Sequence, residues 1–138
     1  MGMFSVFHIS SSGLTAERLR MDIISNNITN ANSTRTQEGG PYRREVPVFA
    51  AILEKAIGGQ VEGKGVQVIG IGKDPSPLKM IFDPGHPDAN EEGYVAMPNV
   101  DVVKEMVDLI TASRAYEANV AVVNAAKNAA AKALEIGR

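Results

Sequence analysis

The chain has 138 residues, about the size of one domain, and its 44% hydrophobic and 22% charged residues are typical of a folded, soluble protein. Fourteen Lys and Arg residues against sixteen Asp and Glu residues give a net charge of −2, which argues against binding to a nucleic-acid backbone. Cysteine is absent, so disulfides, thiolate metal sites and cysteine nucleophiles are excluded. No apolar run approaches the ~18–20 residues of a membrane span, and residues 1–10 lack the basic start of a cleaved signal peptide.

The chain divides into three zones, which predict an α+β fold. All seven prolines and most of the thirteen glycines fall between residues 35 and 98, a zone expected to form a β-rich insert. Residues 1–34 and 99–138 contain no proline and carry apolar residues at helical spacing. We expect these two segments to be long helices that pair as a coiled coil, with the small insert between them.

The N-terminal helix has an apolar line, but it is expected to be weak on its own. Apolar residues recur every seven positions: Phe7, Leu14, Met21 and Ile28. The neighbouring line, which runs through positions 10, 17, 24 and 31, mixes apolar and polar residues. Gly13 costs roughly 1 kcal/mol in a helix interior. This helix therefore depends on packing against other helices.

The strand candidates of the insert are four short runs: Glu45–Leu53, Gly65–Ile71, Leu78–Phe82 and Tyr94–Met97. The end of the first run, residues 50–55, fits a helical turn equally well. Together the four runs predict one small sheet with a minor core, interrupted by the proline-containing loop at residues 83–90.

The C-terminal helix has the clearest pattern in the chain. Ten positions alternate steps of four and three residues, and eight of them are apolar: Val102, Met106, Leu109, Ser113, Tyr116, Val120, Val123, Lys127, Ala130 and Leu134. Val103, Val107 and Ile110 form a second stripe beside its first half. Asn99 or Asp101 is expected to cap its start, and Gly137 its end. The apolar face is wider than one N-terminal helix can cover, which predicts oligomerisation.

Candidates for catalysis or metal binding are few. Asp83, His86 and Asp88 lie on one loop, but a single histidine with carboxylates is a weak metal motif. We expect a solvated structural loop instead, in which Asp88 is dispensable. We expect no metal, no cofactor and no catalytic residue. The remote alternative is a metal-dependent carboxylate enzyme that uses this loop.

Polar residues near the first helix end are candidates for contacts between chains. The asparagines at the end of this helix fit a frayed helix terminus or amide contacts with neighbouring chains. Arg43 and Arg44 beside Tyr42 fit the exposed surface of a turn better than a nucleic-acid patch. The candidate assembly residues are the apolar positions Phe7, Leu14, Met21, Ile28, Val102, Met106, Leu109, Tyr116, Val120, Val123 and Leu134, together with Asn27, Asn30, Asn32, Tyr42, Arg43 and Arg44.

Several motifs in order along the chain resemble one family. The segment DIISNNITNAN at residues 22–32 resembles the N-terminal signature of bacterial flagellar rod, hook and hook-filament axial proteins. The GGPYRR sequence at residues 39–44 is similar to the proximal-rod members of that family, whereas other axial proteins usually have a shorter form. Further similar segments are DPGHPDAN at residues 83–90, PNVDVVKEM at 98–106 and SRAYEAN at 113–119.

This resemblance implies a structural subunit of the proximal rod. Such subunits assemble helically, transmit torque from the MS ring to the distal rod and hook, and line the export channel. They reach the rod, in the periplasm, through the flagellar type III export apparatus without a cleaved signal peptide. The implied partners are other copies of the chain, sibling proximal rod proteins, the adaptor between the MS ring and the rod, and the distal rod protein. The closest alternative is another rod subunit of the same axial family.

Overall fold

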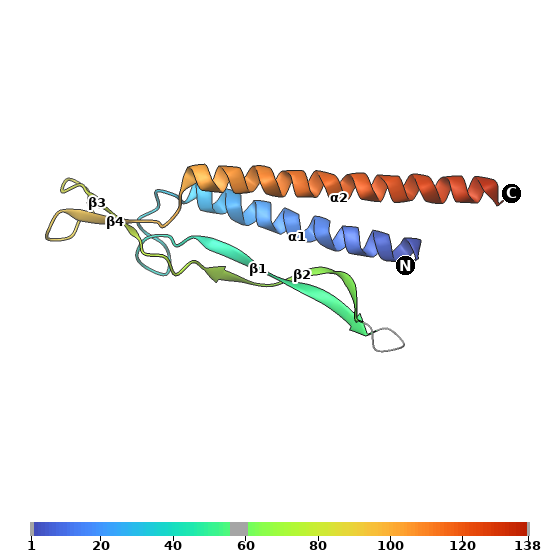
Figure 1. The fold of residues 1–138 in the computed structure, drawn as a ribbon. Coiled ribbons are helices and arrows are strands. Elements are labelled where there is room, and N and C mark those ends of the chain that lie inside the picture. The colour runs from blue at the N-terminus through green and yellow to red at the C-terminus, as the bar shows by residue number, and fades with distance from the viewer. Residues whose placement is uncertain (1, 56–60, 138) are drawn as a thin grey trace.

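The computed structural model describes residues 2–55 and 61–137, and the outermost residues of the expected helical segments, 1 and 138, lie outside that part. The elements in chain order are α1 (Met3–Thr29), β1 (Glu45–Lys55), β2 (Val61–Lys73), β3 (Lys79–Phe82), β4 (Tyr94–Met97) and α2 (Val102–Ile136). The expected α+β fold, with long terminal helices around a small β insert, is confirmed (Figure 1).

The helix ends follow local sequence signals. Asp101 caps α2, because its carboxylate accepts hydrogen bonds from the backbone N–H groups of Val103 at 3.0 Å and Lys104 at 3.3 Å. Asp101, and not Asn99, is therefore the N-cap. Gly137 occupies the C-cap position. The N-cap residue of α1 is Gly2, which offers no side-chain hydrogen bond to the start of the helix, in keeping with the weak helix that its sequence predicts.

Helix α1 is the middle of three layers. It packs against α2 on one side and against the β1–β2 hairpin on the other, and α2 makes no comparable contact with the described strands (Figure 1). The two helices are antiparallel, with Asn27 opposite Glu105 and Gly13 opposite Asn119. Since α2 has 35 residues and α1 has 27, this pairing leaves about two turns at the C-terminal end of α2, roughly 10 Å, extending beyond the start of α1.

The insert contains two separate antiparallel hairpins, so the expectation of one sheet was wrong. Strand β1 pairs with β2, and β3 pairs with β4, without a link between the two sheets. Pro75 and Pro77 lie in the connection between β2 and β3, where they lack the N–H donors that a continuous ladder would need. Residues 50–55 continue β1 as a strand, so the helical-turn alternative was also wrong.

The β1–β2 hairpin is held against α1 by a close backbone approach. Gly65 has a φ of +123°, and a Cβ built on it would collide with the Ser12 hydroxyl. The next residue, Val66, donates its backbone N–H to Ser12 Oγ at 3.1 Å. His8 Nδ1 lies 3.2 Å from the Lys64 carbonyl oxygen. A glycine at position 65 is therefore required for this packing.

The core is thin and made largely of small residues. Its buried apolar members are Ala16, Ile23, Ile24, Ala31, Val95, Val100 and Ala112. On α1, the line that was expected to be secondary is the more buried one, because Ser10, Ile24 and Ala31 are buried. The expected seam is only half-buried in the single chain: Phe7, Leu14, Met21 and Ile28. The residues of α1 that contact α2, Gly13 and Asn27, also lie off the seven-residue line.

On α2, the face toward α1 is likewise shifted from the expected seam. Ala112 is fully buried there, as is Glu105, which contacts α1 directly. Of the expected seam, Leu109, Tyr116 and Val123 are half-buried, and the remaining candidates are exposed: Val102, Met106, Val120 and Leu134.

Candidate assembly surfaces and the junction between them

A buried polar junction links α1, the start of β1 and α2. The side chain of Asn27, at the end of α1, is fully buried and has a partner for each polar atom. Its Nδ2 donates to the Glu45 carbonyl oxygen at 2.9 Å and to Glu105 Oε2 at 3.0 Å. Its Oδ1 accepts from the Glu45 backbone N–H at 2.9 Å and from the Tyr42 hydroxyl at 2.8 Å. The Asn27 side chain therefore binds both the backbone N–H and the backbone carbonyl of Glu45, the first residue of β1.

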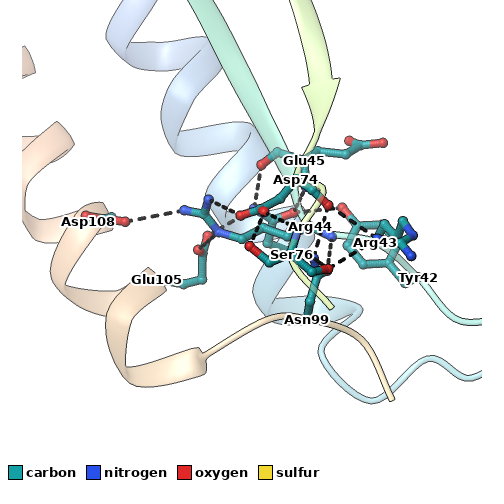
Figure 2. Close-up of polar contacts among 10 residues, drawn as sticks. Tyr42, Arg43, Arg44, Glu45, Asp74, Ser76, Asn99, Glu105 and Asp108 are labelled. Carbon is teal, nitrogen blue, oxygen red and sulfur yellow. Dashed lines mark hydrogen bonds and ion pairs between the residues drawn. The ribbon is translucent and has the colours of Figure 1, made fainter. Parts of the chain in front are cut away.

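Arg44 forms the charged part of this junction. Its Nε donates to Glu105 Oε1 at 2.5 Å, its Nη1 lies 3.3 Å from Asp74 Oδ2, and its Nη2 lies 3.6 Å from Asp108 Oδ2. Figure 2 shows the guanidinium between the two acidic residues of α2 and the segment after β2. Burial opposes the charge on the guanidinium, but the hydrogen bond and charge of Glu105, reinforced by Asp74, raise the pKa of Arg44 above its usual value.

Asn99 connects the residue before β1 with the segment that follows β2. Its Oδ1 accepts from the Arg44 backbone N–H at 2.8 Å, and its Nδ2 donates to the carbonyl oxygens of Asp74 at 3.2 Å and Ser76 at 3.1 Å (Figure 2). Arg43 Nη1 donates to the Ser76 carbonyl at 3.3 Å. Hydrogen bonds from Ser76 are the main cause that lowers the pKa of Asp74, and the contact with Arg44 lowers it further. The junction therefore fixes how the β1–β2 hairpin leaves the helix pair.

Most of the polar residues proposed as assembly candidates form hydrogen bonds within the chain. Asn27, Tyr42 and Arg44 belong to the junction, Arg43 contacts the segment after β2, and Asn30 donates to Asn26 at 2.9 Å. Asn32 is exposed. The interpretation of Arg44 as an exposed turn residue was wrong, since its side chain is only 18% exposed. A direct role of these residues between chains stays a prediction.

The junction also contains acidic residues that sequence reasoning missed. Glu105 and Asp108 lie on α2, where a charged residue in an amphipathic pattern is ordinarily assigned to the solvated face, and Asp74 lies in a proline-containing connection. Glu105 is nevertheless fully buried.

The Tyr42 hydroxyl is affected by this environment. Burial is the main cause that raises the pKa of Tyr42 to about 12, and the negative charges of Glu45 and Glu105 act in the same direction. The hydrogen bond between Tyr42 and Asn26 has the opposite effect on this pKa.

The loop between β3 and β4 has a structural role. Asp88 accepts hydrogen bonds from Thr34 Oγ1 at 2.8 Å and from Arg35 Nε at 2.5 Å, and these contacts lower the pKa of Asp88. His86 Nδ1 accepts the backbone N–H of Asp88 at 3.0 Å. Asp88 therefore anchors this loop to the segment after α1. These contacts argue against the expectation that Asp88 is dispensable. Within residues 2–55 and 61–137, no group of three His, Asp or Glu residues is placed to hold a metal.

Large apolar side chains are exposed on several outer surfaces. On α2 they lie near its start, at Val103, Met106, Val107 and Ile110, and near its end, at Leu134 and Ile136. The hairpins add Val48, Ile69, Ile71, Met80, Ile81 and Phe82. No helix in the described part of the chain is both long and apolar enough to cross a membrane. Exposed apolar surface of this extent is typical of contact with other protein molecules.

Comparisons with known proteins agree on one family. Residues 7–35 match the family model described as flagella basal body rod protein, and residues 91–136 match the model of the flagellar basal body rod FlgEFG protein C-terminal region. A protein named flagellar basal-body rod protein FlgC from Borreliella burgdorferi is 48% identical, over 99% of this chain and 98% of its own length. Proteins with the same name from Bacillus subtilis and Salmonella typhimurium are 45% and 40% identical, each over the full length of both chains.

Proposed function

Because the chain belongs to the family of flagellar basal-body rod proteins, we propose that it is a structural subunit of the flagellar rod. The observation that carries this proposal is the 40–48% identity with rod proteins over almost the whole chain. Exposed apolar surface on both the helices and the hairpins supports it, because a subunit of a continuous assembly must contact several neighbours.

The proposed mechanism is transmission of torque from the MS ring to the distal rod and hook, without chemistry. A subunit that transmits torque must keep the same shape under load. The Asn27–Arg44–Glu105 junction supports this role, because it ties both helices and the start of β1 together through buried hydrogen bonds and an ion pair. We propose no catalytic activity and no cofactor.

The proposed partners are other copies of the chain, sibling proximal rod proteins, the adaptor between the MS ring and the rod, and the distal rod protein. Residues 1–34 and 99–138 would form the inner helical domain, which lines the export channel, and residues 35–98 the outer part. The proposed route is the flagellar type III export apparatus, and the proposed location is the rod in the periplasm. The uncapped start of α1 and the small core of the single chain support a subunit that becomes fully ordered on assembly.

Cryo-electron microscopy of purified basal bodies tests the proposal. We expect density for the paired α1 and α2 helices in the proximal rod, and an antibody to the chain should detect it in the same preparation. Absence of the chain from intact basal bodies would overturn the proposal. Metal analysis of the purified chain tests the enzyme alternative, which requires a stoichiometric ion at Asp83, His86 and Asp88.

Variants of the predicted seam test which face of α2 is used in assembly. We propose that Val120→Asp and Val123→Asp block incorporation into the rod and leave export intact, because a carboxylate buried in an interface without a partner costs several kcal/mol. Glu117→Asp, a change at an exposed acidic position of the same helix, is the matched control. Normal motility of both valine variants would contradict this seam.

A further inference from the structure

Gly13 lies inside α1, where a glycine makes the helix less stable than an alanine would. A Cβ built on Gly13 would lie 3.0 Å from Nδ2, 3.2 Å from Oδ1 and 3.3 Å from Cγ of Asn119 on α2. Because these three distances are nearly equal, the amide group of Asn119 lies flat over the space that a side chain at position 13 would fill. The glycine therefore leaves room on α1 for one particular side chain of α2.

Asn119 lies on the side of α2 that faces α1. Within residues 117–137, the residues that are not exposed are Asn119, Val123, Ala126 and Ala130. Their spacing of four, three and four residues continues the line of the buried Glu105 and Ala112 along α2. Asn119 Nδ2 also donates to the Ala115 carbonyl oxygen at 3.0 Å, one turn earlier in the same helix. This hydrogen bond holds the amide in its orientation over Gly13.

The apolar residues of this half of the helix pair do not define one register. Ala126 and Ala130 are small, so they fit against α1 at several axial positions. The positions of α1 that lie one heptad before and after Gly13 are Val6 and Arg20, and both have side chains where Gly13 leaves space. Asn119 therefore fits over α1 at Gly13, and it does not fit after a shift of one heptad in either direction.

The contact of Gly13 with Asn119 and the hydrogen bond of Asn27 with Glu105 lie two heptads apart on each helix, roughly 21 Å along the axis. A single fixed point at the junction leaves the far ends of two helices free to change their angle and offset. Two fixed points define both the angle and the offset.

We propose that Gly13 and Asn119 form a register lock, in which the amide of Asn119 fills the space over Gly13 and fixes the axial position of α2 on α1. Polar residues in a helix seam specify register in this way, at a cost in stability. The glycine in α1 is that cost here. The lock sets how far α2 extends beyond the start of α1, so that every subunit has a helix pair of the same length. It acts within one chain and does not depend on the proposed function.

A double-mutant cycle in the full chain tests the lock, with urea denaturation as the readout. Gly13→Ala in the unmodified chain should raise the equilibrium constant of unfolding, because the new methyl group displaces the Asn119 amide. In a chain with Asn119→Ala, the same change should lower that constant about fivefold, because the space is empty and alanine favours the helix. Asn124→Ala is the matched control, since Asn124 is exposed on the same helix. Gly13→Ala should remain unfavourable beside it.

Spin labels measure the register directly. Ser11→Cys and Ala125→Cys introduce labels at exposed positions beyond the lock, in a chain that has no native cysteine. Double electron–electron resonance should give one narrow distribution of distances between the two labels. Asn119→Ala should broaden this distribution or add a second peak, because the far halves of the helices then adopt more than one offset. Asn124→Ala should leave the distribution unchanged.

The outcomes separate a register lock from ordinary packing. Equal effects of Gly13→Ala in the unmodified, Asn119→Ala and Asn124→Ala chains would overturn the proposal, because the two residues would then be uncoupled. Coupling in the cycle together with a distribution that stays narrow in Asn119→Ala would also overturn it, since the contact would then stabilise the pair without setting its register. Absence of the chain from basal bodies would bear on the proposed function alone.

Discussion

Asn27 and Glu105 form a buried hydrogen bond between the two long helices, with Asn27 Nδ2 3.0 Å from Glu105 Oε2 and both residues fully inaccessible to solvent. Glu105 also binds the Arg44 guanidinium, so one carboxylate joins α1, α2 and the start of β1. A buried carboxylate is stable only when hydrogen bonds and an opposite charge replace its hydration. The whole junction therefore depends on Glu105.

Removal of this carboxylate should destabilise the chain strongly. Glu105→Ala leaves Arg44 without its nearest acidic partner and Asn27 with an unsatisfied donor, so we expect a loss of about 3 kcal/mol in the free energy of unfolding. Urea denaturation followed by circular dichroism measures it. Glu117→Ala, on the exposed side of α2, should change stability by less than about 0.5 kcal/mol. Similar losses in the two variants would contradict the role given to Glu105.

The sequence predicted the elements of the fold because their signals are local. Prolines and glycines delimit the insert, alternating apolar residues mark the strands, and Asp101 lies at the position of an N-cap. The faces that the helices turn toward each other could not be predicted in the same way. The seven-residue repeat of α1 pointed to Leu14 and Met21, whereas Gly13 and Asn27 are the residues that meet Asn119 and Glu105 of α2.

The polar junction was the main feature that sequence reasoning did not find. The segments that form it are separated by up to 78 residues, as in the contact between Asn27 and Glu105. A glutamate on an amphipathic helix is ordinarily assigned to solvent, and only its neighbours in space show that it is buried. Motif similarity identified residues 22–32 and 39–44 as characteristic of the family, but it did not indicate that Asn27 and Arg44 contact the same carboxylate.

The approach of the hairpin to α1 should depend on the glycine at position 65. Gly65→Ala places a methyl group against the Ser12 hydroxyl at a φ of +123°, and we expect a loss of about 1–3 kcal/mol. Hydrogen exchange of the Val66 amide, which donates to Ser12 Oγ, should become faster. Gly63→Ala is the control, since nothing lies within 4 Å of its Cβ position and its φ is not positive. Unchanged protection of Val66 in Gly65→Ala would disprove this explanation.

Acidification should release the loop between β3 and β4. Hydrogen bonds from Thr34, and then from Arg35, lower the pKa of Asp88 in the folded chain below its value in the unfolded chain. A lowered folded pKa means that this contribution to stability is present above the unfolded value, near pH 4, and is lost as pH falls through the folded value. Stability measured between pH 7 and pH 2 should fall less steeply at its acidic end for Asp88→Asn than for the unmodified chain. Identical slopes would show that the contacts of ionised Asp88 with Thr34 and Arg35 do not contribute to the free energy of unfolding.

The close packing of the two helices should be most sensitive to a larger side chain at position 112. This side chain is 0% exposed on the α1-facing side of α2, so a larger residue must push the helices apart or adopt a strained rotamer. We expect Ala112→Leu to cost about 1–3 kcal/mol of unfolding free energy in urea denaturation. Ala118→Leu is the matched control, because it makes the same substitution at an exposed position of α2, and alanine and leucine have similar helix propensities. A neutral Ala112→Leu would mean that the helices can separate locally without cost. The small core would then be less important to their pairing than the Asn27–Glu105 junction.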